Sequence, residues 1–155
     1  MALPIGLTNE QRAGTVALLK PLLADEYVLY TKTRNYHWNV TGPHFHDLHK
    51  FFESQYEALD ESIDEIAEWI RSLGERSPGS LKEFLSAARL KEASAVKATA
   101  MIEGLLADHE TVIRQLREDV KAAGDKFAAA DVSDFLTGLL EEHEKMAWML
   151  RAMTE

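Results

Sequence analysis

The chain lacks several features that would point to particular protein classes. It has 155 residues and no cysteine, which excludes disulfides, thiolate metal sites and cysteine nucleophiles. Glycine and proline are sparse, at 8 and 4 residues. No apolar run approaches the roughly 20 residues that cross a bilayer, and the opening MALPIGLTNEQ has no signal-peptide pattern. We expect a single domain without membrane segments, in a reducing compartment such as the cytoplasm.

Basic residues are in the minority, which limits the partners that the chain can bind. There are 17 Lys and Arg against 26 Asp and Glu, for a formal net charge of −9. This argues against a generally basic surface for nucleic acid and suits a protein that handles cations. The 46% hydrophobic and 28% charged residues are typical of a globular domain rather than a disordered chain.

Helical periodicity runs through almost the whole chain. Thr8 and Gln11 have the spacing of a capping box that opens a helix reaching about Val40. Pro21 lies inside that segment, which predicts a kink or a later start. The break at NVTGP, residues 39–43, is typical of a turn before the next helix.

A second helix of about 30 residues gives the clearest pattern and should end at Gly74. Its apolar residues recur at steps of three and four: Phe45, Leu48, Phe52, Tyr56, Leu59, Ile63, Ile66, Ile70 and Leu73.

The rest of the chain predicts three more helices. Ser80 and Glu83 can cap a short one over about 81–88, and longer helices should cover about 95–123, ending near Gly124, and about 131–153. The fold class is therefore all-α: a four-helix bundle whose short extra helix lies in the connection between helices two and three. We expect one domain over residues 1–155, with residues 1–7 as a short N-terminal tail.

Candidate metal ligands lie on or near the second helix. His49 with Glu53, and Asp64 with Glu68, have i, i+4 spacing, which puts each pair on one side of the helix. Imidazole and carboxylate together suit iron, manganese or zinc. An acidic pair taken alone is more simply a solvated face, and His37, at the end of the first helix, is alone more simply a core histidine.

The spacing along the second helix excludes a site within one subunit. His49 and Asp64 are 15 residues apart, or about 22 Å along the axis, yet their directions agree within about 60°. Two antiparallel copies about a two-fold axis would bring His49 of one to Asp64 and Glu68 of the other. Two identical sites would then form, and His37 could join the site beside His49.

The remaining histidines receive no role from the sequence. Metals inside a di-iron bundle are held by Glu-x-x-His motifs, but leucine lies three residues before both His109 and His143. We therefore predict no intra-bundle metal site and expect both residues on charged helix faces. His44 and His46 should be exposed bystanders in the corner before the second helix.

Three sequence segments together resemble the Dps proteins, the mini-ferritins of the ferritin-like superfamily. KTRNYHWNVTGPHFHDLHKFFESQYEALDESIDEIAEWIRSLG contains the HWNVTG signature, an LH twelve residues after the first histidine, and D-x-x-A-E. SPGSLKEF is similar to the family's short inter-helix segment, and HEKMAWMLRA to its last helix. The similarity covers nearly the whole chain after about residue 7.

The resemblance implies a hollow homododecamer with ferroxidase sites at its two-fold interfaces. His37 and His49 would come from one subunit, and Asp64 and Glu68 from its neighbour. Glu53 falls where the family has a further acidic ligand. Lys50 replaces an acidic residue common in the family, which alters a surface charge rather than a ligand.

The resemblance further implies a ferroxidase that oxidises Fe²⁺, preferably with hydrogen peroxide, and stores Fe³⁺ in the cage, protecting against oxidative damage. Zinc suits the same ligands. Trp38 falls at the family's tryptophan beside the site, although Trp38, Trp69 and Trp148 are more simply packing residues. Other acidic groups are candidates for pores (Asp125, Asp131, Asp134) or mineral nucleation (Glu57, Asp60, Glu61), unless they are simply solvated charges.

Two alternative functions remain at this stage. One is a protective, nucleoid-associated protein that binds DNA, since DNA affinity comes mostly from Lys and Arg contacts with phosphate. Residues 1–11 contain no Lys or Arg, so we predict that DNA binding is weak or absent. The other is a structural cage that binds zinc or manganese without redox activity.

Overall fold

A computed structural model describes residues 3–155 and shows an all-helical chain. Within this part there is no strand, so the predicted all-α class is confirmed. The elements are α1 (Asn9–Asn39), α2 (Phe45–Ser72), α3 (Leu81–Ala87), α4 (Ala98–Lys121), a π-helical turn η1 (Ala122–Lys126) and α5 (Ala130–Ala152).

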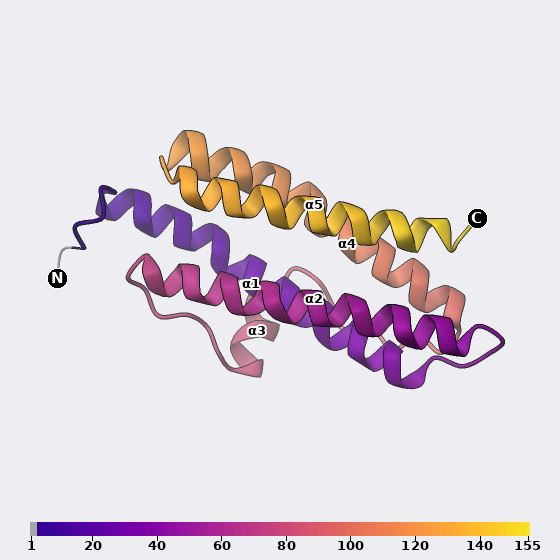
Figure 1. Cartoon of the computed structure of the whole chain (residues 1–155). Coiled ribbons are helices and arrows are strands. Elements are labelled where there is room, and N and C mark those ends of the chain that lie inside the picture. Colours follow the sequence, from indigo (N-terminus) through magenta and orange to yellow (C-terminus); the bar gives the residue numbers. More distant parts are fainter. Residues whose placement is uncertain (1–2) are drawn as a thin grey trace.

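The four long helices form two hairpins that pack into one bundle. α1 lies against α2, and α4 lies against α5, as the lower and upper pairs of Figure 1 show. The connection between α2 and α4 carries α3, which packs on α1. This is the predicted bundle, with its short extra helix between the second and third long helices.

The helix ends follow their local chemistry. The Thr8 side chain accepts the Gln11 main-chain N–H in the predicted capping box, so α1 begins at Asn9 and continues past Pro21. Gly74 has φ +91° directly after the cap of α2, a conformation that glycine adopts without strain. The third long helix starts at residue 98 rather than 95. Of the predicted tail, residues 1–2 lie outside the described part and residues 3–7 are not helical.

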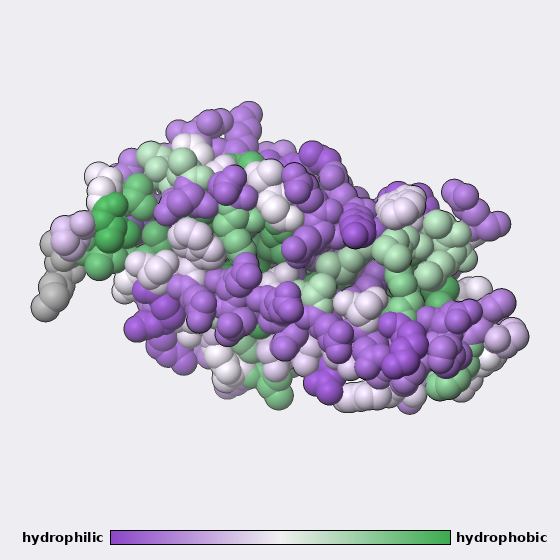
Figure 2. All heavy atoms as spheres, in the orientation of Figure 1, coloured by the Kyte–Doolittle hydropathy of each residue, from purple (hydrophilic) through white to green (hydrophobic). Residues whose placement is uncertain are grey.

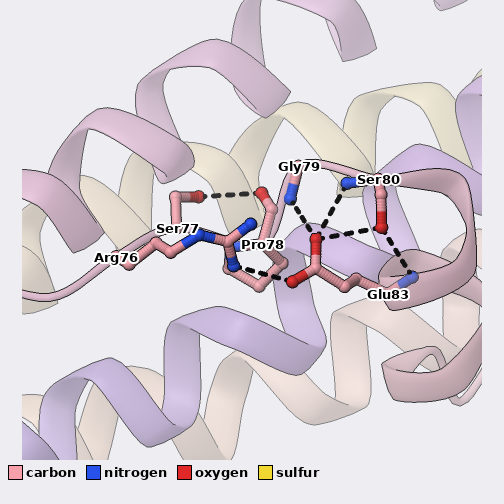
Figure 3. Close-up of polar contacts among 6 residues, drawn as sticks. All are labelled: Arg76, Ser77, Pro78, Gly79, Ser80 and Glu83. Carbon is pink, nitrogen blue, oxygen red and sulfur yellow. Dashed lines mark hydrogen bonds and ion pairs between the residues drawn. The ribbon is translucent and has the colours of Figure 1, made fainter.

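The start of α3 is held by a cluster of hydrogen bonds around Glu83 (Figure 3). The Ser80 hydroxyl accepts the Glu83 main-chain N–H at 3.2 Å, which completes the predicted capping box. Arg76 donates to Glu83 at 2.7 Å, and the main-chain N–H groups of Gly79 and Ser80 each donate to it at 3.0 Å. These contacts favour the carboxylate and lower the pKa of Glu83 to about 2.

The bundle core is continuous and apolar. Leu19, Leu59, Leu105 and Leu136, one from each long helix, are completely buried, and each such side chain contributes about 1.5–3 kcal/mol to folding. At one end, the Phe127 ring packs directly on Gly14, where an added Cβ would lie 2.1 Å from the ring.

One expectation about burial is wrong. His109 and His143 do not lie on charged surface faces: both are completely buried. They continue the core-facing positions of their helices, which outweigh the charged residues beside them in the sequence. Trp38 and Trp148 are each 62% exposed in the single chain, so neither packs in the core of the bundle, and packing at an interface stays a prediction.

The outer surface is mostly polar. In Figure 2 hydrophilic atoms dominate the visible face, while hydrophobic atoms reach the surface in the band between α2 and α5. No helix within residues 3–155 has the length and hydropathy that crossing a membrane requires.

Candidate metal centre

His37 and His49 are joined by two hydrogen bonds across the corner between α1 and α2. The Nδ1–H of His37 donates to the main-chain carbonyl of His49 at 2.7 Å, and the Nδ1–H of His49 donates to that of His37 at 2.8 Å. A carbonyl oxygen can only accept, so both rings must carry their proton on Nδ1 when neutral. Each Nε2 is then left with a lone pair.

The two imidazoles are further fixed by stacking. Their ring centroids are 3.8 Å apart with the planes inclined by 17°, and the Tyr56 ring meets His37 edge-on at 5.2 Å. Main-chain acceptors at Nδ1 are the usual way in which proteins orient metal-binding histidines and fix their tautomer. The pair is therefore suited to bind a cation through its two Nε2 atoms.

Glu53 follows His49 by one helical turn and is half-buried. Its carboxylate accepts from the Lys50 ammonium at 2.9 Å. This hydrogen bond is the main reason that the pKa of Glu53 is lowered, and the charges of His37 and His49 act in the same direction. Glu53 is thus an ionised carboxylate near the imidazoles that is already paired with Lys50.

Asp64 and Glu68 do not meet the histidines within one chain. They are exposed on the later part of the same continuous helix, where Asp64 borders a groove with Leu23 and Phe84. No group of three His, Asp or Glu side chains within residues 3–155 is arranged to hold a metal ion. A single chain therefore presents the two halves of the predicted site apart from each other.

Aromatic residues and one arginine surround the histidine end of the site. The Arg34 guanidinium lies over the rings of Trp38, Tyr56 and Tyr30 at 4.9, 5.3 and 5.5 Å, a cation–π arrangement. Sequence reasoning missed Arg34 and Tyr56 as neighbours of the site. Their signal was helical spacing: residue 34 precedes residue 38 by four, and residue 56 follows residue 49 by seven.

The other polar candidates are solvent-exposed. His44 precedes α2 without making a side-chain cap, and His46 lies 3.6 Å from Asp47 with both side chains more than 80% exposed. The proposed pore and nucleation residues are also exposed in the single chain: Asp125, Asp131, Asp134, Glu57, Asp60 and Glu61.

Comparison with known proteins places this geometry in a family. Residues 16–155 match the model of the ferritin-like domain. The chain is 51% identical over 153 residues to a low temperature-induced protein of Nostoc, covering 97% of this chain and 86% of the relative. It is 38% identical over 138 residues to DNA protection during starvation protein 2 of Bacillus anthracis, covering 88% and 94% respectively.

A solved structure agrees with these relatives. The Dps protein of Vibrio cholerae, described as a member of a broad superfamily of ferritin-like diiron-carboxylate proteins, superposes with a TM-score of 0.94 at 32% identity, covering 99% of this chain and 97% of that one. From its sequence, its fold and its relatives, the chain belongs to the Dps (DNA protection during starvation) family of ferritin-like proteins.

Proposed function

We propose that the protein is a ferroxidase and iron-storage mini-ferritin. The observation that carries the proposal is the reciprocal hydrogen bonding of His37 and His49, which leaves two stacked imidazoles with free Nε2 lone pairs beside an ionised carboxylate. Imidazole and carboxylate donors suit Fe²⁺, which is here the substrate.

The site is completed by a second copy of the chain. Asp64 and Glu68 of one subunit would meet His37, His49 and Glu53 of its neighbour across a two-fold axis, so each interface holds two identical sites. The exposure of both carboxylates in the single chain supports this arrangement, because they are free to meet a partner. We propose that twelve subunits assemble into the cage and that the stored Fe³⁺ lies in its cavity.

In this reaction the protein mainly supplies the side chains that bind iron. Two Fe²⁺ ions each give one electron to hydrogen peroxide, whose O–O bond breaks, and two protons complete two molecules of water. Transfer of both electrons to one peroxide avoids the release of hydroxyl radical, which is how such a protein protects the cell. Exposed carboxylates near pores and on the cavity wall would attract Fe²⁺ by focused negative potential.

Two other functions use the same chain differently. Zinc or manganese in the same ligand set would give a structural cage without redox activity. DNA protection by direct binding is disfavoured by the net charge of −9 per chain, since phosphate repels such a surface. We therefore propose a cytoplasmic iron-handling protein, and a gel shift at low salt should show no tight DNA complex.

The test is Fe²⁺ oxidation by the intact protein. Under anaerobic conditions, substoichiometric Fe²⁺ and peroxide should give ferric absorbance much faster than in buffer alone. His37→Asn combined with Asp64→Asn should reduce the rate at least about tenfold, while His46→Asn, an exposed histidine outside the site, should leave it unchanged. Absence of acceleration, or full activity in the double variant, would reject the ferroxidase. Native mass measurement of apo and iron-loaded protein tests the dodecamer and the store together.

A further inference from the structure

A row of three polar side chains crosses the centre of the apolar core. Glu26 from α1, His143 from α5 and His109 from α4 are all completely buried. His143 Nε2 lies 2.7 Å from a Glu26 carboxyl oxygen, and the Nδ1 atoms of His143 and His109 lie 2.9 Å apart. Both Glu26 oxygens and the Nε2 of each histidine lack a well-directed hydrogen bond.

The contact between the imidazoles depends on a proton count. Two nitrogens at 2.9 Å form a hydrogen bond only when one carries a hydrogen and the other offers a lone pair. If both rings are protonated, two N–H groups point at each other and the bond cannot exist. The core would also then hold two imidazolium charges against one carboxylate, where all three side chains are buried away from the surface.

The row joins the two helical hairpins. Glu26 belongs to the α1–α2 hairpin, while both histidines belong to the α4–α5 hairpin (Figure 1). A second polar link between the hairpins is the ion pair of Lys32 and Asp108 at 2.5 Å. The contact of His143 with Glu26 crosses between the hairpins, and the bond between the rings lies within one hairpin at that same buried place.

We propose that Glu26, His143 and His109 form an acid-sensitive lock between the two hairpins. Near neutral pH the hydrogen bond between the rings and the close contact of His143 with Glu26 are both present, and the hairpins stay together. In mild acid the second imidazole takes up a proton from solvent, the bond between the rings is lost, and a second imidazolium must be buried beside one carboxylate, so the packing of the two hairpins opens. This goes beyond the proposed ferroxidase and does not rest on it.

The charged groups around the row favour this response. α5 contributes Glu142, and the charges of Glu61 and Glu65 from α2 and of Glu26 from α1 act on it. Burial is the main cause that raises the pKa of Glu142; the charge of His143 lowers it, and the charges of Glu65, Glu26 and Glu61 raise it to a smaller extent. Glu142 therefore loses its negative charge at a higher pH than an ordinary glutamate, which removes a charge that would offset a second imidazolium.

Two further carboxylates on the neighbouring elements are already paired with basic side chains. α4 presents Asp108, already paired with Lys32 of α1, and on α1 Asp25 is held by Arg89 from the connection after α3. Burial, and then the charge of His143, lower the pKa of His109 well below 6.5. The unfolded chain binds that proton near pH 6.5 while the folded chain does not, so stability must fall as the pH drops below about 6.5.

Trp69 of α2 provides a built-in reporter, because its ring packs on Phe135 of α5 at 5.8 Å across the two hairpins. In full-length protein carrying Trp38→Phe and Trp148→Phe, Trp69 is the only tryptophan. Its emission should shift to longer wavelength when the pH is lowered from 7 to 4. The His109→Asn substitution is then added; the asparagine amide lies near the position of the His109 Nδ1 and does not titrate in this range. The emission transition should then move to lower pH. His46→Asn, the same substitution at an exposed histidine, should leave it unchanged.

The strength of the effect follows from linkage. Urea titrations at fixed chain concentration give the unfolding equilibrium constant. Between pH 6 and 5 this constant should rise about tenfold more in the parent than in His109→Asn, because unfolding of the parent takes up about one more proton per chain. Equal pH dependence in both proteins would overturn the proposal. Imidazole ¹⁵N NMR of the protein that retains His109 gives a second test, which does not require the His109→Asn variant to fold. Double protonation of both rings while Trp69 emission stays unchanged would also overturn it.

Discussion

His37 and His49 each donate Nδ1–H to the main-chain carbonyl of the other, at 2.7 and 2.8 Å. The main chain at each histidine thereby sets the ring orientation of the other histidine. This relationship needs no metal and no partner subunit, so half of the proposed site is preorganised within the single chain. The other half must come from elsewhere, which can be tested by mixing subunits.

Mixed subunits should regain activity if the site is shared. His49→Asn and Asp64→Asn chains are each expected to be nearly inactive alone. When they are co-expressed with different affinity tags and purified as mixed assemblies, about one quarter of the sites should combine an intact histidine half with an intact acidic half. Anaerobic Fe²⁺ oxidation with peroxide measures the recovery. A mixture as inactive as its parents would indicate that the two halves are not shared between subunits.

Replacing Lys50 should strengthen cation binding. Lys50→Gln removes the ammonium that holds Glu53, so the pKa of Glu53 should rise toward its ordinary value while the carboxylate remains ionised at pH 7. Zinc affinity measured by calorimetry should increase a few-fold, because Glu53 no longer has to break its ion pair with Lys50 before it binds the metal. Lys82→Gln, which removes an equal charge from the exposed face of α3, should have no such effect. Unchanged affinity in Lys50→Gln would argue against Glu53 as a ligand.

The ion pair of Lys32 and Asp108 should be costly to break from one side. Lys32 is 6% exposed and Asp108 17%, so Lys32→Met leaves a poorly solvated carboxylate and should lower the free energy of unfolding by about 3–5 kcal/mol. Urea titration measures this loss. Adding Asp108→Leu should recover most of it, and Lys91→Met at an exposed position should cost little.

The same variant should respond to pH in a defined direction. Burial raises the pKa of Asp108, although Lys32 partly opposes this, and without Lys32 the pKa should rise further. A carboxyl whose folded pKa exceeds its unfolded value destabilises the fold as pH rises through that range. Lys32→Met should therefore regain stability when the pH is lowered from 7 toward 5, relative to the otherwise identical protein that retains Lys32. A loss that does not depend on pH would contradict this.

The cap of α3 predicts an unusual titration. Glu83 should remain ionised until the pH approaches 2, because Arg76 first, and then the N–H groups of Gly79 and Ser80, stabilise its carboxylate. Carboxyl ¹³C NMR on the folded chain measures this directly. Arg76→Gln should move the titration of Glu83 toward 4.5 without disturbing the helices of the bundle. A Glu83 that titrates near 4.5 while Arg76 is intact would refute the geometry shown in Figure 3.

Local patterns predicted most of the fold. Two capping boxes, at Thr8 and Ser80, and the glycine after α2 fixed helix ends closely because each depends on a few adjacent residues. The start of α4 was misplaced because its first residue follows Lys97, whose side chain makes no cap. The histidine pair and Glu53 were found from spacing, but their mutual hydrogen bonds depend on how the corner folds.

The buried row was missed for an identifiable reason. His109 continues the core positions Met101, Leu105, Val112 and Leu116, and His143 continues Leu136, Leu139 and Leu150. The helical spacing therefore contained the signal, but the acidic neighbours in DHE and EEHEK suggested a surface. The residues around Glu26 indicate its burial even less, because a buried carboxylate is recognised only from its partner on another helix.

The reciprocal bonds at the corner between α1 and α2 constrain the number of residues there more than their identity. His37 and His49 meet only because α1 ends at Asn39 and α2 begins at Phe45. Residues such as His44 and His46 can vary without disturbing the rings. Adding or removing a single residue would rotate one helix by about 100° relative to the other and separate both bonds at once. Natural variation at this corner should therefore occur by substitution and not by changes in length.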